Sequence, residues 1–440
     1  MRLVDLRNTA ITNRVTNAAV PRAALNIDTA VEQIAPLLED VRIKGLAALV
    51  EVAKQFDGFD PRPIRVSEAE LDDALAKLNP ELRASIEESI ERVRAVSEAS
   101  MPAGVKATLG DGAVVHQRWQ PVESVGLYVP GGKAVYPSSV VMNVVPAQVA
   151  GVKRLVVATP GQKDFEGRPH PTVLATAALL GVTELYAIGG PAAIAAFAYG
   201  IEEIDLEPVD LVTGPGNIFV AAAKRALRGV IGIDSEAGTT EILVVADETA
   251  DARLIAYDLV SQAEHDEAAA SVLVTHDPAL AEAVQSQVEV VAKATTHAER
   301  VNTALDGQQS AIVLVDNIAA ARQFANFYAT EHLELHTANP HADAALIANA
   351  GAIFLGAYSP VSLGDYMAGS NHVLPTGQQA KFGAGLSVHS FLRAQQVIEY
   401  SREALNQVSG KIQTFANSEG LPAHGEAIAA RFNLDGSRGN

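Results

Sequence analysis

The chain contains no cysteine among its 440 residues. This absence excludes disulfide bonds and thiolate metal sites. It also excludes a cysteine nucleophile of the kind that many enzymes use to carry an aldehyde to an acid. Any metal ion in this protein must therefore be held by histidine, aspartate, glutamate, glutamine or asparagine side chains.

Positive charge is also scarce. The chain has 33 Lys and Arg against 52 Asp and Glu, so its net charge is −19. Non-specific binding of nucleic acid requires a basic face, so the composition argues against a nucleic-acid partner. Small anionic ligands that are held by the backbone N–H groups of helix N-termini remain compatible with this charge.

Membrane-spanning runs are missing as well. The longest stretch without charge, 134–152, is interrupted by Pro137, Asn143, Pro146 and Gln148, which indicates a buried turn and helix rather than a bilayer span. The N-terminus, MRLVDLRNTAITNRV, carries charges throughout and lacks the apolar core of a signal peptide. We therefore expect a cytoplasmic protein with no membrane partner.

Apolar residues make up 48% of the chain, which allows sizeable cores. Strand-like runs such as ESVGLYV, RLVVATP and EILVVADE alternate with helical runs, a pattern typical of parallel sheets. The predicted fold class is α/β, with two Rossmann-like parallel-sheet domains and helical N- and C-terminal segments. From about Val388 we expect helix to the end, SFLRAQQVIEYS included. The domains we expect are an N-terminal segment 1–27 packing with 387–410 as a small helical domain, a larger Rossmann-like domain of 28–127 and 239–386 with N-terminal helices, a smaller one of 128–238, and a C-terminal small domain of 411–440.

The stretch from Ser359 to Ser387 has neither a helical nor a strand period and is rich in glycine. Irregular loops of this length are uncommon in compact domains and are usually functional. It contains one carboxylate, Asp365, and one imidazole, His372. Both side chains are candidates for a site, although hydrogen bonding within the loop would also explain them.

A metal site can be assembled from Asp365 of this loop and side chains outside it. Gln262 and His265 are three residues apart on a predicted helix and so share a face. With Asp365 and with His424 in EGLPAH, they would form an oxygen and nitrogen site suited to zinc or a similar divalent ion. Each residue alone is also compatible with a surface, capping or solvated role.

The stretch EHLELH, 331–336, is not the metalloprotease helix motif, because no Glu directly follows His332. Its alternation favours a strand, which puts Glu331 and His332 at a helix-to-strand junction where an acid and a base can face a cleft. A local ion pair at a turn is the alternative. Two glycine turns, Gly189-Gly190-Pro191 and Gly214-Pro215-Gly216-Asn217, could hold an anion, but the second lacks the third glycine of the dinucleotide fingerprint.

Together these motifs make the chain resemble the histidinol dehydrogenase family along nearly its whole length. The resembling stretches are GLYVPGGKAVYPSSVVMNVVPAQVAGV (126–152), GPGNIFVAAAKR (214–225), Asp234 to Glu241, DLVSQAEHD (258–266), EHLEL (331–335), GAIFLGAYSPVSLGDYMAGSNHVLPT (351–376) and EGLPAH (419–424).

This resemblance implies a homodimeric enzyme with one Zn²⁺ per subunit. It would oxidise L-histidinol to L-histidine with two NAD⁺ through a bound histidinaldehyde, the last step of histidine biosynthesis. The catalytic pair falls on Glu331 and His332. The implied zinc ligands are Gln262, His265, Asp365 and His424, with His424 supplied by the other subunit. The implied substrate contacts are Thr240, Gln262, His265, His332, Asp365, His372, Glu419 and His424, and the implied NAD contacts are Tyr128, Ala192 and Asn217.

Three positions depart from the family pattern: Thr240 stands where serine is common, Ala192 where glutamine is frequent, and Thr330 where proline usually precedes the Glu-His pair. They leave room for a same-fold dehydrogenase of another small amino alcohol or diol. A zinc hydrolase that activates water with Glu331 and a non-catalytic nucleotide-binding protein are two further alternatives. Because no thiol is available, we expect the second oxidation to pass through the hydrated aldehyde, with His332 as the base for hydride loss and Glu331 activating water.

Overall fold

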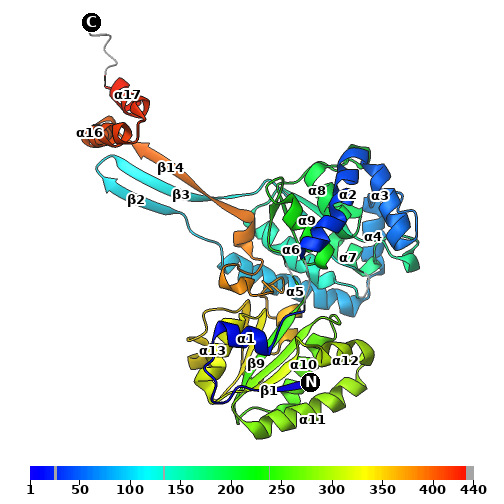
Figure 1. Ribbon diagram of the computed structural model, residues 1–440. Coiled ribbons are helices and arrows are strands. Elements are labelled where there is room, and N and C mark those ends of the chain that lie inside the picture. Colours follow the sequence, from blue (N-terminus) through cyan, green and yellow to red (C-terminus); the bar gives the residue numbers. More distant parts are fainter. Residues whose placement is uncertain (24–26, 132–133, 237, 433–440) are drawn as a thin grey trace. The chain divides into compact units, whose positions relative to one another are not determined.

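Two parallel sheets form the framework of the computed structural model, which describes residues 1–23, 27–131, 134–236 and 238–432. Gly132, Lys133 and Ala237, which belong to the family-like motifs, lie outside the described residues. Both sheets belong to the first of two compact units, Met1–Ser100 with Val122–Phe391, and the second unit is Met101–Pro121 with Leu392–Asn440. Figure 1 shows the elements of each unit.

The larger sheet has six strands, all parallel, and its four inner strands are fully buried, three of them as runs rich in β-branched and aliphatic residues. Such runs are typical of strands that are covered on both faces. The order across the sheet is β1 (Arg2–Asp5), β11 (Ala311–Leu314), β10 (Ala270–Thr275), β9 (Glu241–Ala246), β12 (His332–His336) and β13 (Ala352–Leu355).

Helices cover both faces of this sheet. One apolar core joins the sheet to α10 (Ala252–Ala263), α11 (Pro278–Ala294) and α12 (Ala298–Asp306). A second core joins the opposite face to α1 (Asn13–Ala19) and α13 (Ile318–Tyr328). The short helices α14 (Pro340–Ala344) and α15 (Val361–Tyr366) follow β12 and β13 along the chain.

The smaller sheet has five parallel strands. Its order is β6 (Glu184–Ala187), β5 (Arg154–Thr159), β4 (Ser124–Tyr128), β7 (Leu211–Thr213) and β8 (Gly232–Ile233). The helices that follow its strands are α6 (Pro137–Ala150), α7 (Pro171–Leu179), α8 (Gly190–Tyr199) and α9 (Ile218–Leu227). The predicted α/β class with two Rossmann-like parallel sheets is therefore confirmed.

The N-terminal helices differ from the expected domain arrangement. These are α2 (Ile27–Lys44), α3 (Leu46–Val52), the π-helix Ala53–Asp57, α4 (Glu68–Lys77) and α5 (Pro80–Ala99). They pack on the smaller sheet and not on the larger one: α2 lies against α8 and α9, α4 against α7, and α5 against α6. The reason is that Ile34, Leu38 and Val41 of α2 bury their side chains in the core of the smaller sheet. Residues 1–20, in contrast, supply β1 and α1 to the larger sheet.

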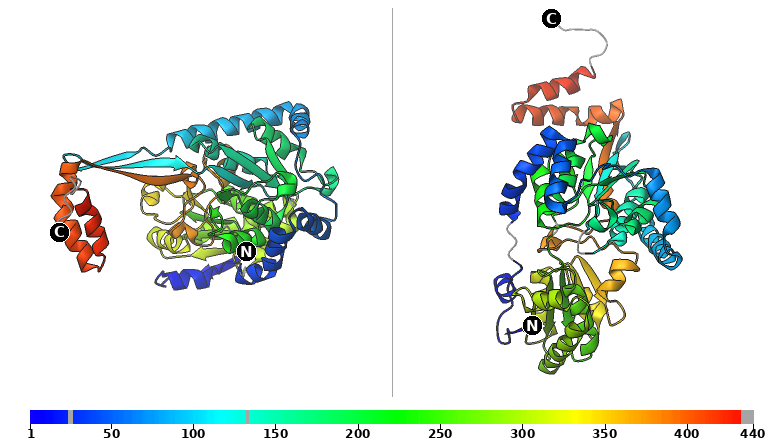
Figure 2. Two further views of the ribbon diagram at one scale, coloured as in Figure 1. Left: turned by 90° about the horizontal axis from the view of Figure 1, so that it is seen from above. Right: turned by 90° about the vertical axis from the view of Figure 1, so that its right-hand side faces the viewer.

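The second unit contains an antiparallel sheet in the order β14 (Leu392–Tyr400), β3 (Ala113–Pro121), β2 (Val105–Gly110), followed by α16 (Arg402–Ser418) and α17 (Pro422–Ala430). Figure 2 shows β3 and β14 running side by side over their full lengths. The prediction of a helix over SFLRAQQVIEYS is therefore wrong. After a 3₁₀ turn at Val388–Phe391, every residue of β14 has a partner in β3.

The irregular loop predicted from Ser359 to Ser387 is also partly wrong, since it contains α15 and a 3₁₀ turn at Gln379–Lys381. The carboxylate of Glu334 accepts the N–H of Val361 at 2.9 Å and so stabilises the first turn of α15. Within the described residues, no helix is both long and apolar enough to cross a bilayer.

Candidate active site

The predicted acid and base lie at the end of the larger sheet where its parallel strands begin. Glu331 precedes β12 and His332 begins it, and both side chains are buried. His332 is in register with Ile242 of the neighbouring strand β9, so Thr240 and Glu241 lie beside the pair. The chain leaves β9 at the carboxyl ends of the parallel strands, and α10 carries it back to their amino ends before β10. The C-terminal end of α10 therefore lies at the same end of the sheet as Glu331 and His332.

Glu331 is held by two donors. The hydroxyl of Thr240 donates to its Oε2 at 2.6 Å, and the backbone N–H of Glu241 donates to the same oxygen at 2.9 Å. Burial raises the pKa of the Glu331 carboxyl, while the His332 ring, the Thr240 hydroxyl and the Glu241 N–H act to lower it. A carboxyl with a raised pKa is suited to take and return protons.

His332 is oriented by a backbone carbonyl. Its Nδ1 lies 3.1 Å from the carbonyl oxygen of Glu241 and 3.5 Å from Oε2 of Glu331. Because a carbonyl oxygen can only accept, the neutral ring carries its proton on Nδ1. Nε2 is then unprotonated, and it is buried without a hydrogen-bond partner among the described residues. A buried imidazole nitrogen without a partner is available to accept a proton or to bind a ligand.

Gln262 and His265 present their free atoms in a similar way. The side-chain N–H of Gln262 donates to Oγ1 of Thr240, which fixes the orientation of the amide. Its carbonyl oxygen is left buried and without a partner among the described residues. His265 lies just beyond the end of α10, where its Nδ1 faces the backbone carbonyls of Ser261 and Gln262 at 3.2 and 3.3 Å. Its Nε2 is thereby available as an acceptor, as in histidines that bind metals.

Asp365 and His372 are brought together by the loop that carries both. Nδ1 of His372 lies 3.1 Å from the backbone carbonyl of Asp365, and its Nε2 lies 3.2 Å from Oγ of Ser139. Burial lowers the pKa of His372, against the opposing effect of the Asp365 charge. The imidazole is therefore neutral at pH 7 and can act as a hydrogen-bond partner for a polar ligand.

Glu419 and His424 belong to the second unit. Glu419 is the residue that ends α16, and His424 lies in the first turn of α17, after Pro422. Both side chains are exposed.

The predicted NAD contacts lie at strand ends of the smaller sheet. The hydroxyl of Tyr128 accepts the N–H of Gly190 at 2.9 Å and so holds the glycine turn before α8, and burial raises the pKa of Tyr128 to about 12. Asn217 caps α9, with its side-chain oxygen accepting two backbone N–H groups. Ala192 is in the first turn of α8, but its methyl group is buried in the core, so only its backbone can face a ligand.

A side chain at Gly214 would come within 2.0 Å of the Tyr128 carbonyl, and Gly214 has a φ of +115°. Only glycine fits there, which keeps the Gly-Pro-Gly turn close to the strand. The N–H of Gly214 donates to Asp234, whose carboxylate also forms a buried ion pair with Lys224 at 2.6 Å.

Sequence reasoning missed three groups of residues near the site. Ser139 contacts His372. The side-chain N–H of Asn143 donates to the backbone carbonyl of Ser139, and the side-chain oxygen of Asn143 accepts from the hydroxyl of Thr213. Arg22 and Glu241 form a buried ion pair. No periodic or motif signal marks these residues, although Ser139 and Glu241 lie within the family-like stretches.

The third missed group is the cluster of Asp258, Glu334 and His336, whose ligand-type atoms all lie within 4.8 Å of one another. His336 and Glu334 are 3.2 Å apart, and burial together with Glu334 raises the pKa of Asp258 to about 8. This set is distinct from the predicted zinc ligands. It is a mostly buried cluster that joins β12 to α10, and its chemistry is also that of a cation site.

An open cavity of about 700 Å³ lies elsewhere in the first unit, beside Arg65, Arg154 and Asp205. None of the predicted site residues lines it.

Comparisons with known proteins show which family the chain is similar to. The family model described as histidinol dehydrogenase matches residues 20–432. The chain is 56% identical over 432 residues to a histidinol dehydrogenase of Leifsonia xyli subsp. xyli, with 98% of this chain and 99% of that protein covered. It is 52% identical over 435 residues to one of Mycolicibacterium smegmatis, with 98% of each covered. The crystal structure of histidinol dehydrogenase from Elizabethkingia anophelis matches with a TM-score of 0.91 and 31% identity over 99% of both chains.

Proposed function

The chain belongs to the histidinol dehydrogenase family, and from this premise we propose that it oxidises L-histidinol to L-histidine with two NAD⁺ through a bound histidinaldehyde. The observation that carries the proposal is the placement of His332: its Nδ1 faces a backbone carbonyl, and its Nε2 is buried and has no hydrogen-bond partner among the described residues. A carboxyl, Glu331, lies directly beside it. The two side chains supply one base for each proton that a four-electron oxidation releases next to the substrate carbon.

In the first step, Nε2 of His332 takes the hydroxyl proton of the alcohol as hydride leaves the carbinol carbon for the first NAD⁺. The products are the aldehyde, NADH and a proton on the imidazole. The carbonyl of Glu241 accepts from Nδ1 throughout, so the ring keeps its orientation while Nε2 gains and loses a proton.

In the second step, Glu331 takes a proton from water, whose oxygen adds to the aldehyde carbon, while the protonated His332 returns its proton to the aldehyde oxygen, and the hydrate is formed. His332, neutral again, then takes a proton from the hydrate as hydride leaves for the second NAD⁺, and the carboxylic acid is formed. The absence of cysteine supports this route, because the chain offers no thiol to form a thiohemiacetal.

The residues around this pair fit a zinc ion. Gln262 supplies a buried carbonyl oxygen without a partner, and His265 supplies an Nε2 whose ring is oriented through Nδ1. Asp365 and His424 would add a carboxylate and a second imidazole, which completes an oxygen and nitrogen set of the kind that zinc accepts. When bound, the ion's chemistry is to orient the amino and imidazole nitrogens of the substrate. Thr240, His372 and Glu419 are then left to contact its remaining polar groups.

NAD is proposed to bind at the strand ends of the smaller sheet, near Tyr128, Asn217 and the backbone of Ala192. The N-terminus of α8 lies at this end of the sheet, where a helix dipole favours a phosphate, and Tyr128 holds the turn in place through the Gly190 N–H.

The enzyme is proposed to act as a homodimer in the cytoplasm. The second unit exposes large apolar side chains: Val105, Leu109, Ile398 and Phe415 are 59, 66, 68 and 68% exposed in the single chain. Several exposed large apolar side chains on a thin sheet and helix pair are typical of a subunit interface. A second copy of this chain is the partner that we propose for it.

Steady-state NADH formation tests the substrate. L-Histidinol should have a kcat/KM about 100-fold or more above other amino alcohols and diols, because the site has polar groups that pair with its imidazole and amine. A preference for another alcohol would favour the same-fold dehydrogenase. Turnover of an ester or amide without NAD⁺ would favour the hydrolase, and full binding of NAD⁺ without any turnover would favour the non-catalytic protein.

A further inference from the structure

One residue contacts both members of the catalytic pair through its backbone. Glu241 is the first residue of β9, and its side chain is 3% exposed. Its N–H donates to Oε2 of Glu331 at 2.9 Å, and its carbonyl oxygen accepts from Nδ1 of His332 at 3.1 Å. The direction in which this one residue's peptide groups point therefore sets the geometry of the acid and the tautomer of the base.

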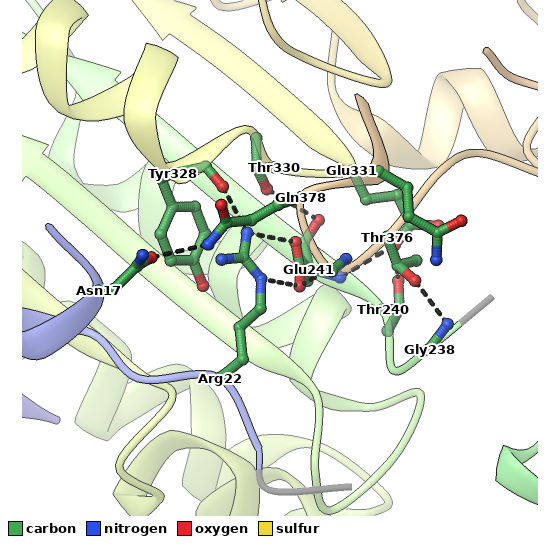
Figure 3. Close-up of polar contacts among 12 residues, drawn as sticks. Asn17, Arg22, Gly238, Thr240, Glu241, Tyr328, Thr330, Glu331, Thr376 and Gln378 are labelled. Carbon is green, nitrogen blue, oxygen red and sulfur yellow. Dashed lines mark hydrogen bonds and ion pairs between the residues drawn. The ribbon is translucent and has the colours of Figure 1, made fainter. Parts of the chain in front are cut away.

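The side chain of Glu241 is itself fixed from a distant part of the chain. Nε of Arg22 donates to Oε1 at 2.6 Å and Nη2 of Arg22 donates to Oε2 at 3.2 Å, which makes a two-pronged pair, while the N–H of Gly377 donates to Oε1 at 3.1 Å. Figure 3 shows the guanidinium of Arg22 between Glu241 and the ring of Tyr328. Both charges are largely removed from water, which makes the pair sensitive to loss of either partner.

Arg22 is anchored on three sides. Its guanidinium carbon lies 4.1 Å from the centre of the Tyr328 ring, and Nη2 also donates to the Tyr328 backbone carbonyl. Such a stacked and bidentate guanidinium has little freedom to turn. Tyr328 is the last residue of α13, shortly before Glu331 in the chain. Arg22 therefore contacts both the segment that precedes the catalytic pair and Glu241 of the neighbouring strand.

The loop beside this pair is fastened to it. Gly377 binds the Glu241 carboxylate, Thr376 accepts the N–H of Gly238, and Gln378 donates to Asn17 near Arg22 (Figure 3). The polar network thus joins the N-terminal segment, the start of β9 and the loop in one connected set.

We infer that Glu241 is a positioning residue for Glu331 and His332, and that Arg22 acts on the reaction by holding Glu241 in place. Neither side chain is among those that we propose to contact the substrate. The inference rests on the proposed roles of the catalytic pair, and it adds two residues whose contribution is to keep Nε2 of His332 unprotonated and Glu331 within reach of its donors.

The test compares Arg22→Met and Arg22→Lys with a matched control, Arg322→Met. Arg322 forms a second partly buried pair in the same unit, with Asp343 at 2.6 Å, but it contacts neither catalytic residue. Each zinc-loaded variant is assayed with L-histidinol, and rates are expressed per zinc-loaded active site. We expect Arg22→Met to lower kcat at least tenfold with less than a twofold change in KM, and Arg22→Lys to recover only part of the loss, because it keeps the charge but neither the two-pronged pair nor the stacking. Arg322→Met should lose stability but keep its kcat.

A second readout does not depend on turnover. The ¹⁵N chemical shifts of the His332 ring in the free enzyme report its tautomer, and Arg22→Met should shift population from the Nδ1–H form to the Nε2–H form. The inference is overturned if Arg22→Met keeps the wild-type kcat and tautomer, or if Arg322→Met loses as much kcat as Arg22→Met. If the wild-type enzyme itself fails to oxidise L-histidinol, the proposed function fails, and the ring shifts alone decide the inference.

Discussion

Thr240 connects the proposed metal ligand Gln262 with the proposed catalytic carboxyl of Glu331. Its hydroxyl donates to Glu331 at 2.6 Å and accepts the side-chain N–H of Gln262. Replacing it by valine keeps the shape and removes both hydrogen bonds. A hydrogen bond to a charged group is worth about 1.5–3 kcal/mol. At about 1.36 kcal/mol for each factor of ten, aldehyde oxidation should slow by about 10- to 150-fold.

The substitution should also move the pH profile in a defined direction. The Thr240 hydroxyl is one of the groups that lower the pKa of Glu331 against the effect of burial. Without it the pKa of Glu331 rises, so the pH below which aldehyde oxidation is lost moves upward. The assay supplies histidinaldehyde directly and follows NADH across pH.

Thr240→Ser is the control for this variant, because it keeps the hydroxyl and restores the residue that is common in the family. The rate of Thr240→Ser should stay within about twofold of wild type, since only the methyl group of a partly buried residue is lost. The reasoning is refuted if Thr240→Val oxidises the aldehyde as fast as wild type at every pH. It is equally refuted if Thr240→Ser is slowed as much as Thr240→Val.

Three further outcomes follow from the same structure. His332→Asn should slow alcohol oxidation by about 10²- to 10⁴-fold in rapid-mixing measurements of NADH, and a wild-type rate would remove His332 as the base. Tyr128→Phe removes the acceptor for the Gly190 N–H, and loss of about 1 kcal/mol should weaken NAD⁺ binding about fivefold by calorimetry, with an unchanged affinity arguing against this turn. Burial and Glu334 raise the pKa of Asp258 from its ordinary value of 3.8 to about 8, so between these pH values the folded state keeps a proton that the unfolded carboxyl has lost, and the free energy of unfolding falls as pH rises. Asp258→Asn should flatten that slope in denaturant titrations at about pH 5 and about pH 8, and an unchanged slope would contradict the shift.

Much of the fold could be predicted because its signals are local. The larger and smaller sheets are built from short apolar runs that read directly as buried strands, and the alternation in EHLELH correctly predicts β12. The convergence of Gln262 with Glu331 follows from the parallel order, since the end of α10 must return to the amino ends of the strands.

The errors arose where a distant partner decides the structure. LRAQQVIEY can be read as an amphipathic helix, but its pairing with β3, more than two hundred residues earlier, makes it a strand. In the same way, α15 begins inside a glycine-rich loop because Glu334 of β12 accepts the N–H of Val361. Arg22 and Glu241 are 219 residues apart, and Glu241 acts through its peptide groups, which no reading of side-chain types can detect.

The central claim is that one site carries out both oxidations. The most direct measurement is the yield of NADH from a limiting amount of L-histidinol, with and without a zinc chelator. Two NADH for each L-histidinol, with L-histidine as the only product and no NADH after chelation until Zn²⁺ is restored, is the predicted result. One NADH for each L-histidinol with release of histidinaldehyde, or an unchanged yield without metal, would contradict the account.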